Sequence, residues 1–417
     1  MNIRPKALGT LFLCLVGLQG LLYCGSMNQQ ESRGAQPASA VHFEIGSSAC
    51  NIPFRIVDNA MYVTIRINES NDVLAAFDSG LPLNGVLVID SAAASKLGLV
   101  YVGRVGLGGA GDETAVADLA VDATVSLPGV TFKGQQVLVA RDTKRYDKWL
   151  PSAIIGGTML NSCVVQIDHE KSLLHIYKSG SFDSLTAGER FEIAFSQGIP
   201  VIDAKLEHKG NHPVRVRLLV DTGADVPFAL HSCEGLGVQP PPDALTWYIS
   251  EGIKGDVYGQ WARIDAIHIG SFRLDSCLVA YPTAGFEDVR TLLGQNGFLG
   301  LEGQRRFTLT FDYPHSRIYL KPNSWYGSPF EFNMAGLVLR TLRSGAWEVM
   351  DVIPNAPGSL AGIRKGDSIV AVDGRSCSSI EFAEREHMFA QKNVPLRLSV
   401  KRGGMILDTS LILVRII

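Results

Sequence analysis

The sequence lacks a surplus of charge of either sign. It carries 38 Lys and Arg against 41 Asp and Glu, with a formal net charge of -3 and a pI near 6.3. Domains that hold nucleic acid or anionic lipid through a basic surface need a clear excess of Lys and Arg. This balance therefore disfavours a nucleic-acid-binding function.

Several chemistry-bearing motifs are also missing. Neither His-Glu-x-x-His nor Gly-x-Ser-x-Gly occurs, so zinc-peptidase and α/β-hydrolase chemistry lack their nucleating residues. No spacing of Cys or His resembles a metal site, and we expect neither a metal nor another cofactor. Residues 106–111 fit the dinucleotide fingerprint in spacing, but a strand pattern follows them instead of the helix that a pyrophosphate needs. His175 and His268 fall in apolar strand patterns and are expected to be structural.

Cysteines are few, seven in all, and five of them lie beyond the N-terminal segment: Cys50, Cys163, Cys233, Cys277 and Cys377. An oxidising compartment would permit a bridge between Cys50 and Cys163. A second bridge could join Cys233 to Cys277, although sequence alone does not fix the pairing. Buried, unreactive thiols are the alternative that we favour.

The N-terminus predicts export from the cytoplasm. Two basic residues precede an apolar run over residues 7–23, which is typical of a signal segment, and we assign residues 1–24 to it. Residues 21–26 resemble a bacterial lipoprotein box, which would make Cys24 the lipidated residue. The competing interpretation keeps the segment uncleaved as a single anchor, near the lower length limit for crossing a bilayer. Residues 25–40 are polar and read as a flexible tether.

Both interpretations of the N-terminus lead to the same location. The bulk of the protein is expected outside the cytoplasm and attached to a membrane, as a periplasmic or cell-surface protein. No sequence feature selects one of these two places.

The whole chain is long enough for about three domains, and an internal repeat organises its middle part. In each copy an apolar strand runs into Asp-Ser-Gly or Asp-Thr-Gly, and an apolar pair before glycine follows later. These landmarks are Ala75–Gly80 with Ile154–Gly156, and Leu218–Gly223 with Phe298–Gly300. Gly156 follows Asp78 by 78 residues, and Gly300 follows Asp221 by 79. The matched intervals predict two lobes of one architecture, over residues 41–182 and 183–322.

The lobes are expected to be all-β. Every second residue from Ala115 to Leu127 is apolar, which predicts a half-buried strand. Short strand patterns with Gly and Pro punctuation recur throughout, and helical patterns such as Asp90–Leu97 are brief.

Two aspartates at strand ends suggest acid–base chemistry. A pair of carboxyls held together shares one proton, because like charges a few ångströms apart resist ionising together. One member can then take a proton from water while the other gives one to a substrate carbonyl. Ser79 and Thr222 can hydrogen-bond between the two turns and hold Asp78 and Asp221 coplanar. Glycine after each hydroxyl residue lets the turns approach closely.

These residues resemble the pepsin and retropepsin superfamily of aspartic proteases. Residues 219–225 resemble the active-site turn of retroviral proteases, residues 298–300 resemble the superfamily's second motif, and the resemblance covers about residues 54–320 in two passes. It implies a bilobal pepsin-like fold whose site is complete in a monomer. It also implies the following roles: catalytic Asp78 and Asp221, supporting Ser79, Gly80, Thr222, Gly223, Ile155, Gly156, Leu299 and Gly300, and substrate-binding Ala224 and Asp225.

The same resemblance implies a glycine-rich hairpin that covers the substrate. Two segments are candidates for this flap, residues 106–111 in the first lobe and residues 252–259 in the second. Only the second contains a tyrosine, Tyr258. A plain mobile hairpin is the alternative for each.

Residues 330–417 resemble a bacterial PDZ domain, with a turn signal at Asp373-Gly374 and a short helix ending at Gly362. Such domains add a peptide's C-terminal segment to a sheet edge as an extra strand. The resemblance implies a carboxylate-binding loop at Ala335, Gly336 and Leu337.

The sequence therefore predicts an aspartic endopeptidase that hydrolyses extracytoplasmic proteins between Asp78 and Asp221. The PDZ domain would bind substrate or regulatory C-termini. The alternative is a non-catalytic, membrane-anchored scaffold that binds peptides.

Overall fold

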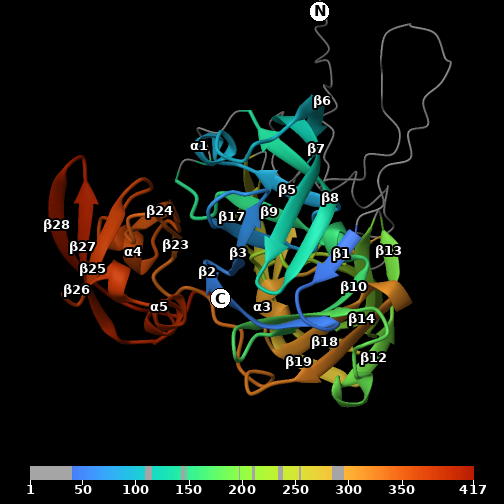
Figure 1. The fold of residues 1–417 in the computed structure, drawn as a ribbon. Coiled ribbons are helices and arrows are strands. Elements are labelled where there is room, and N and C mark those ends of the chain that lie inside the picture. The colour runs from blue at the N-terminus through green and yellow to red at the C-terminus, as the bar shows by residue number, and fades with distance from the viewer. Residues whose placement is uncertain are drawn as a thin grey trace, which may run out of the picture.

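The computed structural model describes residues 40–108, 115–141, 146, 148–196, 198–208, 212–232, 238–252, 255–283 and 295–417. The predicted signal, Cys24 and nearly all of the predicted tether lie outside these residues. No helix in the described part of the chain is long and apolar enough to cross a membrane. The described chain is built mostly of strands, as the sequence predicts (Figure 1).

The first copy of the repeat contains β1 (Ala40–Phe43), β2 (Ser48–Val57), β3 (Ala60–Ile67), β4 (Val73–Asp78), β5 (Gly85–Val88), α1 (Ser91–Ala94), β6 (Tyr101–Leu107), β7 (Ala115–Leu127), β8 (Val130–Ala140), β9 (Ala153–Gly156), β10 (Cys163–Asp168) and β11 (Leu173–Lys178). The second copy contains β12 (Glu189–Glu192), β13 (Ala194–Ser196), β14 (Ile199–Glu207), β15 (Val214–Val220), β16 (Phe228–Leu230), β17 (Leu245–Gly252), β18 (Gly255–Ile269), β19 (Phe272–Pro282), β20 (Gly297–Leu299), α3 (Leu301–Gln304), β21 (Phe307–Asp312) and β22 (Arg317–Pro322). Short 3-10 turns also occur, among them η2 (Gly157–Leu160), η3 (Ser184–Thr186) and η5 (Tyr313–His315).

The two copies share one pattern of strand pairing. In the first, β4 is parallel to β9, β9 is antiparallel to β5, and β5 is parallel to β8. In the second, β15 is parallel to β20, β20 is antiparallel to β16, and β16 is parallel to β19. The repeat seen in the sequence is therefore a repeat of topology.

A central antiparallel pair, β10 with β21, joins the copies. Within it Gln166 lies opposite Thr310, and these two residues occupy equivalent positions, each two residues before the aspartate that ends its strand, Asp168 or Asp312. Their side chains also hydrogen-bond, from Gln166 Nε2 to Thr310 Oγ1 at 3.3 Å. Equivalent residues that face each other mark an approximate twofold axis.

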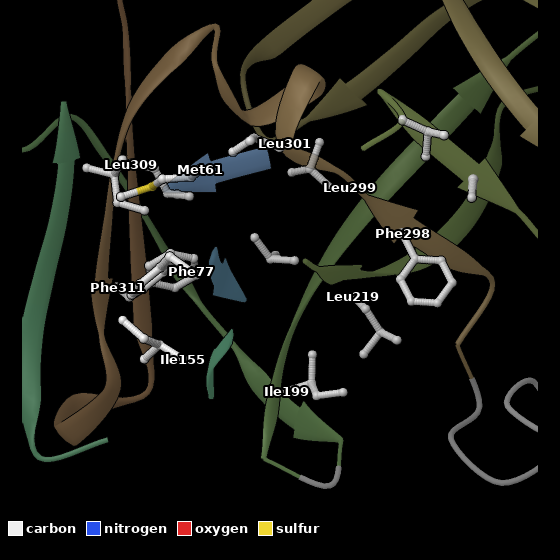
Figure 2. Packing of buried hydrophobic residues seen from close by; sticks show 14 of the residues in the cluster. Met61, Phe77, Ile155, Ile199, Leu219, Phe298, Leu299, Leu301, Leu309 and Phe311 are labelled. Carbon is white, nitrogen blue, oxygen red and sulfur yellow. The ribbon is translucent and has the colours of Figure 1, made fainter. Parts of the chain in front are cut away.

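One continuous hydrophobic cluster fills both copies. Figure 2 shows Phe77 and Ile155 from the first copy beside Phe311 from the second, with Met61 next to Leu309. All of these side chains are buried. Burial of this kind stabilises by about 25 cal/mol per Å² of apolar surface, so the shared core binds the copies into one body.

The strand predicted over Ala115–Leu127 has the predicted bounds, but its alternation breaks midway. Asp122 has a positive φ of 59°, and the pairing with β8 shifts register between Ala120 and Ala123. This β-bulge moves Val121 to the surface, where the strict alternation had placed it inside. The helix expected over Asp90–Leu97 is shorter, Ser91–Ala94, with Asp90 as its N-cap.

The disulfide that the sequence permitted between Cys50 and Cys163 is not formed. Both residues are free thiols, as are Cys277 and Cys377, so the bridge to Cys277 is also wrong, and Cys233 lies outside the described residues. Burial raises the pKa of Cys163 to about 11 and that of Cys277 to about 12. Thiols held protonated in this way are unreactive, as the favoured interpretation expected for Cys163 and Cys277, whereas Cys50 is exposed and departs from that interpretation.

The C-terminal domain forms a separate six-stranded sheet beside the larger body (Figure 1). Its elements are β23 (Leu337–Thr341), β24 (Trp347–Val352), α4 (Pro357–Leu360), β25 (Ser368–Val372), β26 (Arg375–Ser376), η6 (Cys377–Ser379), α5 (Phe382–Phe389), β27 (Pro395–Arg402) and β28 (Met405–Ile412). Asp373 and Gly374 both have positive φ, 48° and 78°, at the predicted hairpin turn. Gly362, with φ 79°, ends the region of α4 as predicted.

Gly300→Ala should destabilise the protein. A Cβ there would lie 2.0 Å from Val226 O, a backbone atom that cannot move alone. We expect a loss of about 1–3 kcal/mol in the free energy of unfolding, measured by urea denaturation. Gly103→Ala in β6 is the matched control, because its Cβ meets nothing within 4 Å. Equal stability of the two variants would contradict the close packing at Gly300.

Candidate active site

The two repeated aspartates stand where apolar strands end. Asp78 is the last residue of β4, and its neighbour Phe77 pairs with Ile155 in β9. Asp221 follows β15, where Val220 pairs with Leu299 in β20. Ile155 and Leu299 are buried, so the apolar pair of each copy supports its own turn, as the sequence predicts.

Reciprocal hydrogen bonds join the two turns. The backbone N–H of Ser79 donates to Thr222 Oγ1 at 2.8 Å, and the N–H of Thr222 donates to Ser79 Oγ at 3.0 Å. Each hydroxyl then donates across the interface, Ser79 to Val220 O at 2.9 Å and Thr222 to Phe77 O at 2.9 Å. Both side chains are buried, so all four bonds are protected from water.

These bonds bring the carboxyl groups face to face. A Cβ on Gly80 would lie 2.3 Å from Asp221 Cγ, and a Cβ on Gly223 would lie 2.4 Å from Asp78 Cγ. Each carboxyl therefore sits against the glycine of the opposite turn. Each also accepts from the glycine of its own turn, since Gly80 N donates to Asp78 and Gly223 N donates to Asp221, both at 2.8 Å.

The pair has the electrostatics of a shared proton. Burial raises the pKa of Asp78 well above its usual range, and the charge of Asp221 and a hydrogen bond between the two carboxyls raise it further. Burial also raises the pKa of Asp221, against the hydrogen bond from Gly223. The two groups titrate as one unit, so the proton belongs to the pair.

The aspartates lie at a cavity of about 340 Å³. Both copies line it, as does the C-terminal domain through Val338–Thr341 and Met350. The predicted substrate-binding residues Ala224 and Asp225 are also in the wall. A volume of this size lies at the lower end of the range for pockets that bind small ligands, about 300–1,000 Å³.

Asp225 has the most perturbed isolated carboxyl in the cavity. Burial raises its pKa to about 7, and the negative charges of Asp58 and Asp221 contribute to the rise. A carboxyl that stays protonated near neutrality can donate a hydrogen bond to a carbonyl oxygen. Burial likewise raises the pKa of Tyr248, in the same wall, beyond its normal range.

The two flap candidates differ in what they cover. In the β17–β18 hairpin, Ile249–Gly252 and Val257 line the cavity, whereas Tyr258 is 43% exposed and does not belong to the lining. From the first candidate, Gly108 is in the wall, and residues 109–111 lie outside the described chain.

Sequence reasoning missed several polar residues of the cavity wall, among them Asp58, Trp149, Glu251 and Arg340. Trp149 Nε1 donates to Glu251 Oε2 at 3.1 Å, and Arg340 forms an ion pair with the same carboxylate. Asp58 sits in the turn between β2 and β3, where a local pattern predicts only a hairpin. No spacing links these residues along the chain, so only the fold reveals them.

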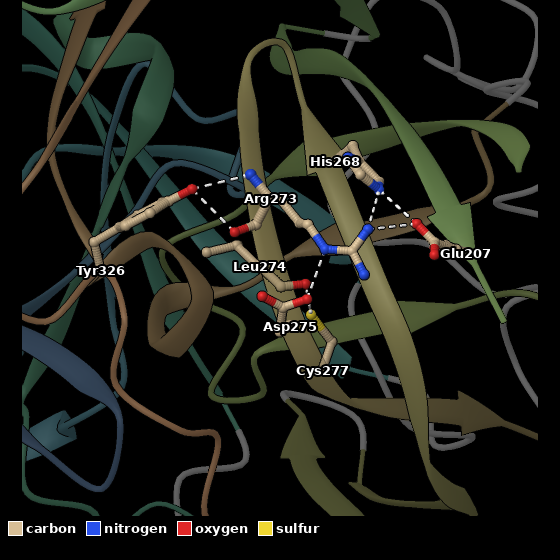
Figure 3. A network of polar contacts seen from close by, with 7 residues as sticks. All are labelled: Glu207, His268, Arg273, Leu274, Asp275, Cys277 and Tyr326. Carbon is tan, nitrogen blue, oxygen red and sulfur yellow. Dashed lines mark hydrogen bonds and ion pairs between the residues drawn. The ribbon is translucent and has the colours of Figure 1, made fainter.

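His268 does not belong to the candidate site. Figure 3 shows its ring, on β18, beside Glu207 of β14 and Arg273 of β19. It is not part of the cavity wall. In the described part of the chain no group of three or more His, Cys, Asp and Glu side chains could hold a metal ion.

The C-terminal domain has an assignable family. Residues 336–413 match the PDZ domain family. The C-terminal domain is a PDZ domain. A PDZ domain suggests peptide binding, normally by strand addition. No curated protein matches the chain in sequence.

In the predicted carboxylate-binding loop of the PDZ domain, backbone amides are already hydrogen-bonded within the loop. The N–H of Ala335 donates to Asn333 Oδ1 at 3.0 Å, and the N–H of Gly336 donates to Asn333 O at 3.1 Å. Ala335 and Leu337 are buried. A peptide carboxylate that binds these amides must therefore replace Asn333.

Thr222→Val should weaken the whole assembly, because valine has the shape of threonine without the hydroxyl. The buried N–H of Ser79 would lose its acceptor and Phe77 O its donor. We expect a loss of about 1–3 kcal/mol for each group left unsatisfied, read from urea denaturation. Thr222→Ser keeps the hydroxyl and is the control. A valine variant as stable as wild type would contradict the role given to these bonds.

Asp225→Asn should change how stability depends on pH. Between the ordinary pKa of an aspartate and about 7, the unfolded chain loses this proton while the folded chain keeps it. The free energy of unfolding therefore falls as pH rises, by at most about 1.4 kcal/mol per pH unit from this group. The Asn variant should lack that contribution in urea titrations from pH 4 to 8. Asp203→Asn, a 92% exposed side chain, should keep the wild-type slope.

Proposed function

We propose that the chain is an aspartic-type endopeptidase and that residues 41–182 and 183–322 form two retropepsin-like lobes. The observation that carries the proposal is the approach of the Asp78 and Asp221 carboxyls across the glycines of opposite turns. The shared pairing pattern of the two copies and the reciprocal bonds of Ser79 and Thr222 support it.

The chemistry follows from one proton on two carboxyls. The ionised carboxylate removes a proton from a water molecule, whose oxygen attacks the scissile carbonyl carbon. The protonated carboxyl donates its proton to the carbonyl oxygen, giving a neutral tetrahedral diol. Collapse of the diol passes a proton to the amide nitrogen, breaks the C–N bond and leaves the pair singly protonated.

The cavity wall suits an extended peptide. Asp225, with its raised pKa, and Ala224 stand next to the carboxyl pair, in position to bind substrate backbone. The β17–β18 hairpin is the element best placed to cover the bound chain, since its tip residues Glu251 and Gly252 line the cavity.

The substrates we propose are extracytoplasmic proteins. The apolar segment at residues 7–23 supports export and attachment to a membrane, either through a lipid on Cys24 or through the uncleaved segment. The PDZ domain would hold substrate or regulatory C-termini.

Asp78→Asn and Asp221→Asn should each abolish cleavage of reduced, unfolded casein. Losing the acid–base pair should lower the rate at least about 100-fold, while urea denaturation shows stability equal to or above wild type, because the buried repulsion is gone. Asp72→Asn, with a side chain 75% exposed, is the control and should cleave normally. Full activity in either active-site variant would contradict the proposal. A wild-type protein that never cleaves but binds peptides would favour the scaffold.

A further inference from the structure

The PDZ strand that receives a peptide in strand addition faces the catalytic cavity. β23 is the end strand of its sheet and pairs there with β24 alone. Val338, Leu339, Arg340 and Thr341 of this strand line the same cavity as Asp78 and Asp221. The edge at which a peptide would add is therefore turned toward the cleft.

Asp58 occupies part of that edge. Its carboxylate accepts from the backbone N–H of Thr341 at 2.7 Å and from Thr341 Oγ1 at 3.0 Å. It also pairs with Arg385 Nη2 at 2.7 Å, a guanidinium whose side chain is only 5% exposed. A backbone N–H on a sheet edge is the donor that an added strand uses, so the carboxylate stands where a peptide carbonyl would bind.

Ion pairs and apolar contacts together hold the domains in this position, since Ile353 and Ala356 of the PDZ domain belong to the hydrophobic cluster of the larger body. Arg343 pairs with Asp90 at 3.0 Å, Lys365 pairs with Asp256 at 3.4 Å, and Arg340 pairs with Glu251. In each of these contacts, and in that of Asp58, the acid belongs to the larger body and the base to the PDZ domain. One pair is reversed, Lys148 with Glu348.

Two parts of the predicted peptide-binding site are thus occupied by contacts within the protein. Asn333 takes the amides of the carboxylate loop, and Asp58 takes an edge amide of β23. Both contacts are ones that a bound peptide would have to replace.

We infer that docking of the PDZ domain on the cleft and peptide addition to β23 exclude each other, with Asp58 as the gating residue. A peptide that adds to β23 displaces Asp58, releases the domain and widens the entrance to the cavity. This inference rests on the proposed peptidase function for its consequence, which is activation by a C-terminal peptide. The exclusion itself concerns only the contact between the domains.

The size of the effect follows from linkage. If the docked state excludes the peptide, then removing a docking contact strengthens peptide binding by up to the factor by which it weakens docking. Coupling between sites of this kind is commonly about 5- to 150-fold. High salt should act in the same direction, because the outer ion pairs are screened.

The test compares Asp58→Ala with Asp72→Ala in the full chain. Asp72 is the matched control, an exposed carboxylate in the same half of the larger body. Three measurements are made: hydrogen–deuterium exchange of residues 337–341, cleavage of reduced casein, and binding of a random decapeptide pool with free C-terminal carboxylates, against the same pool amidated. For Asp58→Ala we expect faster exchange, and at least about fivefold gains in cleavage and in carboxylate-dependent binding.

The outcomes separate the two proposals. If Asp58→Ala matches Asp72→Ala in exchange and in peptide binding, the gating inference is overturned, whether or not casein is cleaved. If exchange and binding rise but no variant cleaves casein, the exclusion stands and the peptidase proposal fails. If Asp58→Ala unfolds, wild-type protein titrated with sodium chloride replaces it, and a lack of change in exchange or binding overturns the inference.

Discussion

The structure depends on the four hydrogen bonds that Ser79 and Thr222 make between the two copies of the repeat. Each bond crosses the approximate twofold axis, and each satisfies a buried polar group. Without them, two carboxyls that repel one another would have to be held together by packing alone. The hydroxyls therefore make a crowded, electrostatically unfavourable pair tolerable in the folded state.

The hydrophobic cluster complements this arrangement. Because side chains of both copies contribute to one core, a shift of one copy would disturb packing over the whole body. The turns that carry Asp78 and Asp221 thus rest on strands that cannot move independently. A preorganised site requires both features, strands that hold the turns rigidly and hydrogen bonds that fix their orientation.

The sequence predicted much of this because repetition is visible along the chain. The matched intervals around Asp78 and Asp221 located the turns, the buried pairs beside them, and the glycines where no Cβ fits. The match of residues 336–413 confirms a PDZ domain where the sequence predicted one. These features share one property, which is that residues near in sequence carry the signal.

What the sequence did not reveal is set by contacts between distant segments. The bulge at Asp122 depends on pairing with β8. Cys50 lies on β2 and Cys163 on β10, with β11 between these strands, so the two residues form no disulfide. In the sequence Asp58 is recognisable only as a turn residue. Its contact with the PDZ domain is visible only in the folded structure. Contacts between docked domains produce no periodic pattern in the sequence. The sequence therefore could not link Glu251 or Arg340 to the cavity.

The two copies are joined in a single chain, and this frees their turns to diverge. Asp225 stands four residues after Asp221, and the residue in the corresponding place after Asp78 is Pro82. One half of the cavity thus offers an ionisable side chain at this position, whereas Pro82 does not belong to the cavity wall. The walls on the two sides of the carboxyl pair are therefore unlike, so under the proposed function the cleft would distinguish the direction in which a bound backbone runs.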